Sequence, residues 1–215
     1  LNPGPLIPAG DRAFLSGRQL WQTDGTEAGT VLVEAAPGNV SHAAFVNGGL
    51  WFRGQAPDQP DVQGLWTSTG QPGVTTFLGA GRAEPADFTG LGSLTLFSAW
   101  DGDAGRELWK SDGTAAGTVR VADLRPGGEG SAPERLFAWK DHVYFWATGA
   151  DGVTTLWKSD GTEAGTARLR AATLRRGVEY GWDDGGFIAW GDALYFAGQD
   201  AEGGRELWRT DGSDS

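Results

Sequence analysis

Short apolar runs alternate with polar turns along the whole chain, with the two-residue period that is typical of β-strands. Pairs of runs separated by only a few polar residues predict hairpins. Four such pairs are 43–46 with 50–52, 86–91 with 94–100, 135–139 with 143–146, and 187–190 with 194–197. Both alternating positions are often apolar, as in 94–100, so both faces of each sheet must be covered. The pattern predicts an all-β protein.

A Leu-Trp pair recurs at a spacing that suits the blades of a β-propeller. The five copies are Leu20-Trp21, Leu65-Trp66, Leu108-Trp109, Leu156-Trp157 and Leu207-Trp208. Their surroundings align as well, since 105–113 reads GRELWKSDG, 204–212 reads GRELWRTDG and 17–25 reads GRQLWQTDG. After the pair, an Asp-Gly turn leads to a β-branched run such as 118–121. Each unit is therefore expected to hold four antiparallel strands.

We predict a single domain, a five-bladed β-propeller in which neighbouring blades cover each other's faces. A β-prism and a linear β-solenoid are the alternatives. The expected blades are about 1–38, 39–80, 81–127, 128–177 and 178–215.

The last unit stops before its fourth strand, and this leaves the edge of its third strand unpaired. The opening residues Leu1-Asn2-Pro3-Gly4 resemble 124–127, which follow a fourth strand. We expect either a five-bladed ring with a three-stranded last blade or a fragment of a longer array. Strand sharing or oligomerisation through the incomplete blade is a further expectation. The absence of methionine suggests a piece of a longer precursor.

The units resemble the bacterial repeat family named for its Glu-Leu-Trp-x-x-Asp-Gly-Thr (ELWxxDGT) motif. The motif is matched in full at Glu107 to Thr114, and at Glu206 to Gly212 with Ser213 in place of threonine. Gln19 and Thr155 replace the glutamate in two copies, and the second copy degenerates at 67–70. The resemblance implies a secreted or surface-exposed bacterial protein with a propeller-like fold. The turn is also similar to the Asp-box of sialidases, a structural element.

Composition and charge exclude several classes of function. The net charge of −11 argues against nucleic acid and anionic membranes as partners. The chain has no cysteine, so disulfides and thiolate sites are absent. No run of eighteen apolar residues occurs, and we expect no membrane insertion and no signal peptide. Catalytic motifs for phosphate binding, zinc proteolysis or a serine nucleophile are missing.

The repeat breaks most clearly between Thr173 and Gly186, a connection from a fourth strand to the next blade. An aromatic platform beside guanidinium and carboxylate groups is typical of sugar recognition. A long surface loop with its tryptophan packed on the next blade is the alternative. The candidate ligand-binding residues are Arg175, Arg176, Glu179, Tyr180, Trp182, Asp183 and Asp184.

Other polar residues have weaker claims to a role. Asp101, Asp103 and Glu107 are spaced as in a calcium loop, although Arg106 competes for the same carboxylates. Calcium is the one cofactor that the sequence suggests. His42 and His142 are interpreted as solvated turn residues. The repeated turn aspartates are expected to accept hydrogen bonds from their own turns; they are Asp24, Asp112, Asp160 and Asp211.

The tryptophans of the Leu-Trp pairs are expected between blades, and five further strand tryptophans are expected in the core. The five are Trp51, Trp100, Trp139, Trp146 and Trp190.

The leading hypothesis for function is a secreted or surface-exposed, non-catalytic binding module of lectin-like, carbohydrate-binding or adhesive character. Its partner would be a glycan or a protein. A structural scaffold for protein–protein interaction is the first alternative. A propeller glycosidase with two acids in a central funnel is the second.

Overall fold

The computed structural model describes residues 5–34, 40–79, 83–173, 186–199 and 204–213. Their strands fall into five sheets in chain order. Blades 1 and 2 are β1 (Leu6–Ala9), β2 (Arg12–Leu15), β3 (Leu20–Thr23), β4 (Val31–Glu34), β5 (Ser41–Val46), β6 (Gly49–Ala56), β7 (Gln59–Ser68) and β8 (Thr75–Gly79). Blades 3 and 4 are β9 (Ala83–Leu91), β10 (Leu94–Trp100), β11 (Arg106–Ser111), β12 (Val119–Ala122), β13 (Glu134–Trp139), β14 (His142–Thr148), β15 (Thr154–Ser159) and β16 (Ala167–Thr173). Blade 5 is β17 (Phe187–Trp190), β18 (Ala193–Gln199) and β19 (Arg205–Thr210).

Each of the first four blades is an antiparallel meander of four strands, and the fifth has three. A single backbone pairing, Thr173 with Gln199, joins the edge of blade 4 to blade 5. The prediction of an all-β, five-bladed propeller with an incomplete last blade is confirmed. The hairpins expected from the apolar runs are also confirmed, as β5–β6, β9–β10, β13–β14 and β17–β18.

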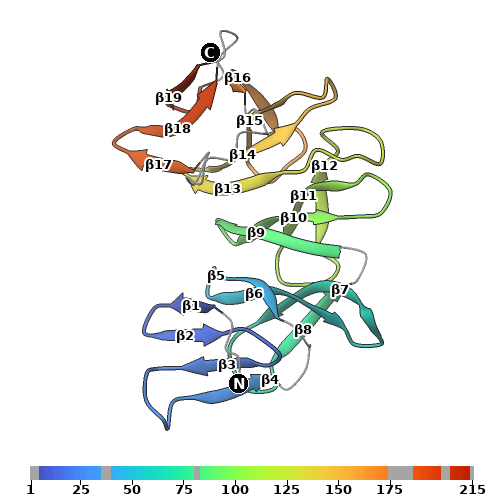
Figure 1. Ribbon diagram of the computed structural model, residues 1–215, viewed down its shortest axis with the longest axis vertical. Helices are drawn as coiled ribbons and strands as arrows, with labels where there is room; N and C mark the ends of the chain where they lie inside the picture. Colours follow the sequence, from blue (N-terminus) through green and yellow to red (C-terminus); the bar gives the residue numbers. More distant parts are fainter. Residues whose placement is uncertain (1–4, 35–39, 80–82, 174–185, 200–203, 214–215) are drawn as a thin grey trace.

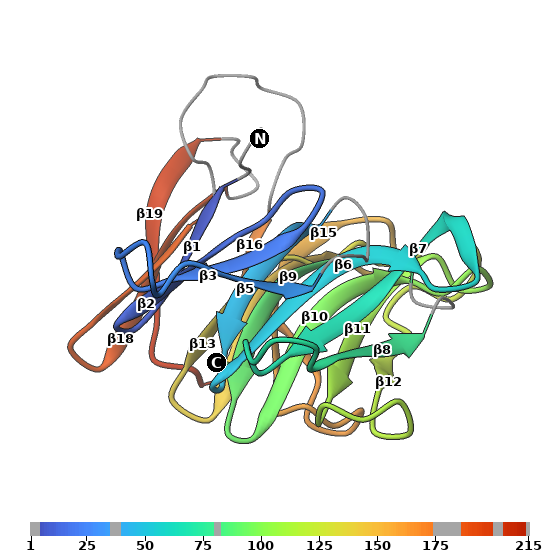
Figure 2. The same cartoon turned by 90° about the horizontal axis from the view of Figure 1, so that it is seen from below.

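The blades follow one another along an arc (Figure 1). The first strands of blades 1 to 4 contact one another in turn, β1 with β5, β5 with β9 and β9 with β13, and so lie on the inner side of the arc. Blades 1 and 5 lie at opposite ends, with an open side between them (Figure 1). Turned by 90°, successive sheets are seen one behind another with their faces together (Figure 2). The five blades therefore form an open propeller.

Four apolar clusters lie between the five blades, one at each junction. The Leu-Trp pair explains this construction because adjacent residues of a strand point to opposite faces. In blade 3, Leu108 packs with Val143 and Phe145 of blade 4, whereas Trp109 packs with Trp51 of blade 2. At each of the four junctions, the leucine of the earlier blade thus packs on the following blade and the tryptophan of the later blade on the preceding one.

The predicted core tryptophans are confirmed except at the ends of strands and of the arc. Two predictions of burial are wrong, because Trp190 is 75% exposed and Trp100 is 41% exposed. Trp190 lies on the face of blade 5 that is turned away from blade 4, and Trp100 is the last residue of β10. Trp21 lies on the opposite open face and joins none of the clusters of described residues. Those in junction clusters are Trp51, Trp66, Trp109, Trp139, Trp146, Trp157 and Trp208.

The Asp-Gly-Thr turns are held by their own side chains, as predicted. Asp112 Oδ1 accepts hydrogen bonds from Thr114 N (2.9 Å) and Thr114 Oγ1 (2.7 Å). Thr114 Oγ1 then accepts from Gly117 N, where a Cβ would lie 2.1 Å from the Asp112 carboxylate. Gly117, the later glycine of the motif, therefore cannot be replaced by a larger residue without a clash. The other turn aspartates also accept from the residue two positions on; they are Asp24, Asp160 and Asp211.

Candidate functional site

The predicted ligand loop cannot be placed, because its residues lie outside the part of the chain that the structure describes. They are Arg175, Arg176, Glu179, Tyr180, Trp182, Asp183 and Asp184. Their role in sugar binding stays a prediction.

Two of the three residues suggested for calcium, Glu107 and Asp101, make other contacts. Glu107 is fully buried and accepts hydrogen bonds from the backbone N–H and hydroxyl of Ser131. Asp101 accepts one from Ala104 N (2.7 Å) and another from Arg120 (2.9 Å), and Asp103 is exposed. Among the described residues, no three His, Cys, Asp or Glu side chains are grouped to hold a metal ion.

A different set of polar residues lies on the inner strands of blades 2, 3 and 4. His42, Asp87 and Arg135 each stand four residues before the end of their strand, and each lies in a β-bulge. Their φ angles are +47°, +56° and +58°, in the left-handed region where glycine is the least strained residue. Three consecutive blades thus carry a titratable or charged side chain where glycine would relieve strain. Such strain is common at binding sites.

Asp87 lies among these groups. It accepts a hydrogen bond from the backbone N–H of Arg135, and it lies within electrostatic reach of His42 and Arg106. Crowding by protein atoms raises the pKa of Asp87 and outweighs the opposing effect of Arg106 and of the other two neighbours. Asp87 as a residue nevertheless remains exposed at the surface.

Two more cations and a second acid adjoin this group. Arg106 donates to Glu84 Oε2 (3.1 Å), to the Glu84 carbonyl (2.9 Å) and to Ser98 Oγ (3.0 Å). Arg53 lies 3.9 Å from the other oxygen of Glu84. Its buried Nε has no hydrogen-bond partner among the described residues. Glu84 itself is 57% exposed and so faces solvent between two guanidinium groups.

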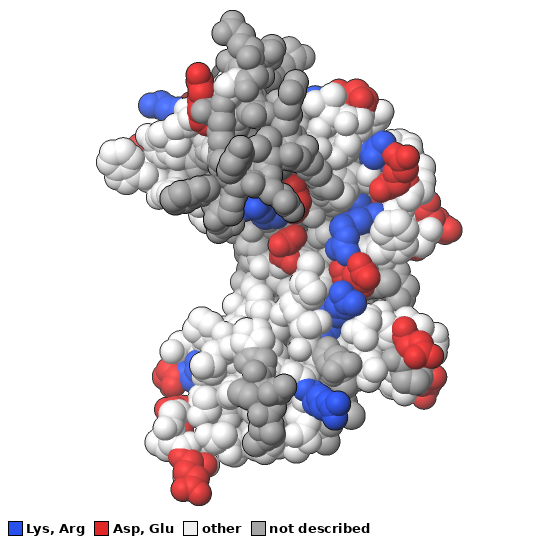
Figure 3. All heavy atoms as spheres, viewed as in Figure 1, with Lys and Arg blue, Asp and Glu red and all other residues white. Residues whose placement is uncertain are grey.

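We refer to these residues together as the inner cluster. Its members are His42, Arg53, Glu84, Asp87, Arg106 and Arg135. Side chains of both signs lie over the middle of the arc (Figure 3). Three arginines against two acids make the inner cluster rich in cations within a chain of net charge −11. The arrangement offers planar donors and carboxylate acceptors to a polar ligand.

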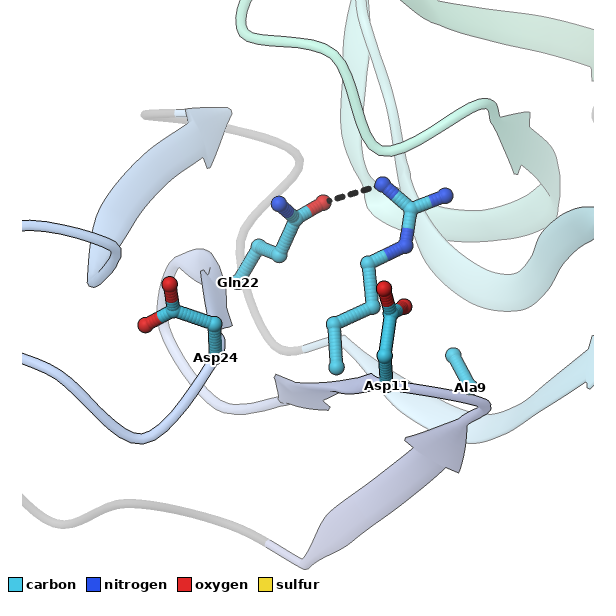
Figure 4. A pocket seen from close by; sticks show the side chains of 5 residues that line it. Ala9, Asp11, Gln22 and Asp24 are labelled. Atoms are coloured by element: carbon cyan, nitrogen blue, oxygen red, sulfur yellow. Dashed lines mark hydrogen bonds between the residues drawn. The ribbon is translucent and has the colours of Figure 1, made fainter.

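A cavity lies on blade 1, away from the inner cluster. It has a volume of about 500 Å³ and is shown from close by in Figure 4. Gln22 Oε1 accepts a hydrogen bond from Arg12 (2.9 Å) across it. Gly70 of blade 2 adjoins this glutamine, because a Cβ there would lie 2.8 Å from Gln22 Oε1. The cavity therefore occurs beside the degenerate second turn, and its lining is Ala9, Asp11, Arg12, Gln22 and Asp24.

Sequence reasoning missed both features. His42 was assigned to a solvated turn and Arg106 to a competitor for calcium, whereas Glu84, Asp87 and Arg135 received no role. A usable signal existed in the alignment of the inner strands, where His, Asp and Arg occupy one equivalent position. The equivalence of these positions becomes clear only when the β-bulges are known, and the apolar periodicity of the sequence does not reveal β-bulges.

No protein-family model matches the chain, and a search of curated proteins also finds no match. In the described residues, no helix is long and apolar enough to cross a membrane.

Similar folds do occur among solved structures. One is a putative TolB from Agrobacterium tumefaciens, with 12% identity, a TM-score of 0.56, and coverage of 98% of this chain and 76% of that chain. Another, from work on two prolyl endopeptidases, has 11% identity, a TM-score of 0.58, and coverage of 96% and 33%. The computationally designed Ika8 protein has 13% identity, a TM-score of 0.54, and coverage of 99% and 63%. The chain thus spans less than two thirds of the designed protein and of the endopeptidase. At these identities the likeness shows the propeller fold alone.

Proposed function

We propose that this protein is a non-catalytic binding propeller that binds a polar ligand at the inner cluster. Carbohydrates that carry carboxylates are the class of ligand that we propose first. The observation that carries the proposal is the equivalent placement of His42, Asp87 and Arg135 on three consecutive inner strands. A scaffold alone would be less strained with glycine at these positions.

The chemistry of the inner cluster suits such a ligand. Guanidinium groups bind carboxylates and paired hydroxyls through two parallel hydrogen bonds, and carboxylates accept from sugar hydroxyls. The excess of cations favours an acidic ligand over a neutral one. The resemblance to the ELWxxDGT family adds the expectation of an exported or surface-exposed protein, which is the setting for a glycan ligand.

A protein ligand is the second candidate, and the exposed inner side of the arc favours it, because an extended acidic peptide could follow the inner strands. A titration distinguishes the carbohydrate ligand from the protein ligand. Isothermal calorimetry would compare an oligosaccharide of uronic acids, a neutral oligosaccharide of equal length and an acidic peptide. The proposal expects binding of the uronic oligosaccharide above the other two.

The matched variants are Arg135→Gln and Arg168→Gln. Arg168 lies on the outer strand β16, where it pairs with Asp151 (2.6 Å). Loss of one charged hydrogen-bonding pair, about 1.5–3 kcal/mol, weakens binding roughly tenfold or more. Arg135→Gln should show this loss and Arg168→Gln should not. Absence of binding, an equal loss in both variants, or hydrolysis of the sugar would overturn the proposal.

A further inference from the structure

The internal junctions between blades share one construction. The leucine of the earlier blade and the tryptophan of the later blade enter the same apolar cluster. The second residue after that leucine reaches the turn of the later blade at three of the four junctions. Lys110 Nζ donates to the Gly161 carbonyl and Lys158 Nζ to the Gly212 carbonyl, both at 2.7 Å. At the first junction the side-chain oxygen of the shorter Gln22 lies close to a turn glycine, Gly70.

The end face of blade 5 carries the same groups, and no further blade packs on it among the described residues. Ile188 is 69% exposed, Trp190 75% and Leu207 77%. Tyr195 pairs with both Ile188 and Arg209, which places those three on one face of the sheet. Arg209 occupies the position of the two lysines and is exposed. This face is prepared for a following blade.

The end face of blade 1 carries the opposite half of the junction. Trp21 pairs with Leu15, which pairs with Leu6, so the three share the face that a preceding blade would cover. Leu6 is 62% exposed. The turn glycine, Gly25, has no atom within 4 Å of a Cβ built on it, as is also true of Gly113 at the second junction, whereas at Gly212 the phenol oxygen of Tyr144 in the preceding blade would lie 2.6 Å away. The turn of blade 1 is open to a donor.

We propose that these two faces bind each other head to tail, so that blade 5 of one copy packs on blade 1 of a second copy of this chain. Leu207 then packs against Trp21, as each internal leucine does with the tryptophan of the next blade. Arg209 donates to the Gly25 carbonyl, as the two lysines do to their turn glycines. The complementarity is the one that already joins the blades within the chain.

A second copy fits these faces better than closure of the same chain on itself. Blades 1 and 5 stand at opposite ends of the arc (Figure 1). Closure would have to repack at least one of the four apolar clusters, and close-packed cores resist such deformation. A second copy docks with the clusters unchanged. Since the two faces differ, the contact is heterologous, and the assembly extends beyond a dimer unless it closes into a ring.

Sedimentation velocity on the 215-residue chain tests the proposal with one charged substitution at each face. Leu207→Asp destroys the blade 5 face and Leu6→Asp the blade 1 face, and both side chains are exposed in the single copy, so the fold should survive. We expect the unsubstituted chain to self-associate with rising concentration, and each variant alone to associate at least about tenfold more weakly. An equimolar mixture of the two variants should form a dimer and nothing larger, because each supplies one intact face.

Val119→Asp is the control, since Val119 is 41% exposed on the outer strand β12 of an internal blade, and it should associate like the unsubstituted chain. A monomer at every soluble concentration would overturn the proposal. Dimers of Leu6→Asp alone would also overturn it, because they would show a contact between like faces. The chain lacks cysteine, so a Leu6→Cys, Leu207→Cys double variant reports closure directly. Oxidation to a cross-linked monomer would sink the second-copy proposal, whereas cross-linked oligomers would support it.

Discussion

Strands β11 and β19 have almost the same sequence and opposite surroundings. The segments 105–113 and 204–212 differ at two of nine positions. In blade 3, Leu108 is fully buried and Glu107 is fully buried with it. In blade 5, Leu207 is 77% exposed and Glu206 is exposed. The burial of the motif is therefore decided by the neighbouring blade and not by the motif itself.

The tryptophans of the same two strands show which face of the sheet accounts for the difference in burial. Trp109 is buried against blade 2, and Trp208 is partly buried against blade 4, because a preceding blade is present in both cases. Only the side that faces a following blade differs. A comparison of the two strands therefore gives the contribution of a following blade to the free energy of unfolding. Substitution of equivalent residues in the two strands measures this contribution.

The largest difference is expected for the leucines. Leu108→Ala should lower the free energy of unfolding by about 2–5 kcal/mol, because it leaves a cavity in a packed cluster. Leu207→Ala should change it by less than about 0.5 kcal/mol, because the side chain is exposed. Urea denaturation at a concentration where the chain is monomeric measures both. Equal losses would show that Leu207 is packed within the monomer and would contradict its exposure.

The sequence was sufficient for the fold because its repeat is carried by residues whose roles are local. The Asp-Gly-Thr turn closes through its own hydrogen bonds, and the Leu-Trp pair points to both faces by strand geometry alone. The burial of Trp190 was predicted wrongly because it depends on a neighbouring blade, and no described residue of the chain packs on that face. The inner cluster was missed because its members, such as Asp87 and Arg135, are brought together by bulges on different strands.

A smaller difference is expected for the glutamates. Glu107 accepts hydrogen bonds from Ser131 N (2.7 Å) and from the Ser131 hydroxyl, and it holds the loop between β12 and β13 against β11 of blade 3. Glu107→Ala leaves a buried N–H without its acceptor, which costs about 1–3 kcal/mol. Glu206→Ala should have an effect within about 0.5 kcal/mol because Glu206 is exposed. Thermal or urea unfolding of both variants checks this, and a harmless Glu107→Ala would contradict the role given to the hydrogen bonds.

The smallest expected effect concerns pH, and here the two kinds of acid in the motif act in opposite directions. Burial raises the pKa of Glu107 above its ordinary value, despite the hydrogen bonds from Ser131 and Leu124. The side chain of Thr114 and then its backbone N–H lower the pKa of Asp112. The stability that Asp112 contributes is therefore present above its ordinary pKa and lost as the pH falls below it.

Glu107 contributes with the opposite sign, because folding favours its protonated form. Its contribution is complete below the ordinary pKa of glutamate and is lost as the pH rises from there through the raised value. Glu107→Gln keeps a neutral side chain at every pH, so the variant should lack this loss while it retains the acid-side loss caused by Asp112. Urea midpoints from pH 3 to 7 would show the curves of variant and unsubstituted chain separating as the pH rises, with Glu206→Gln as the matched control. Parallel curves would mean that Glu107 is ionised in the folded protein as readily as in the unfolded chain, and that the burial seen in blade 3 does not govern its charge.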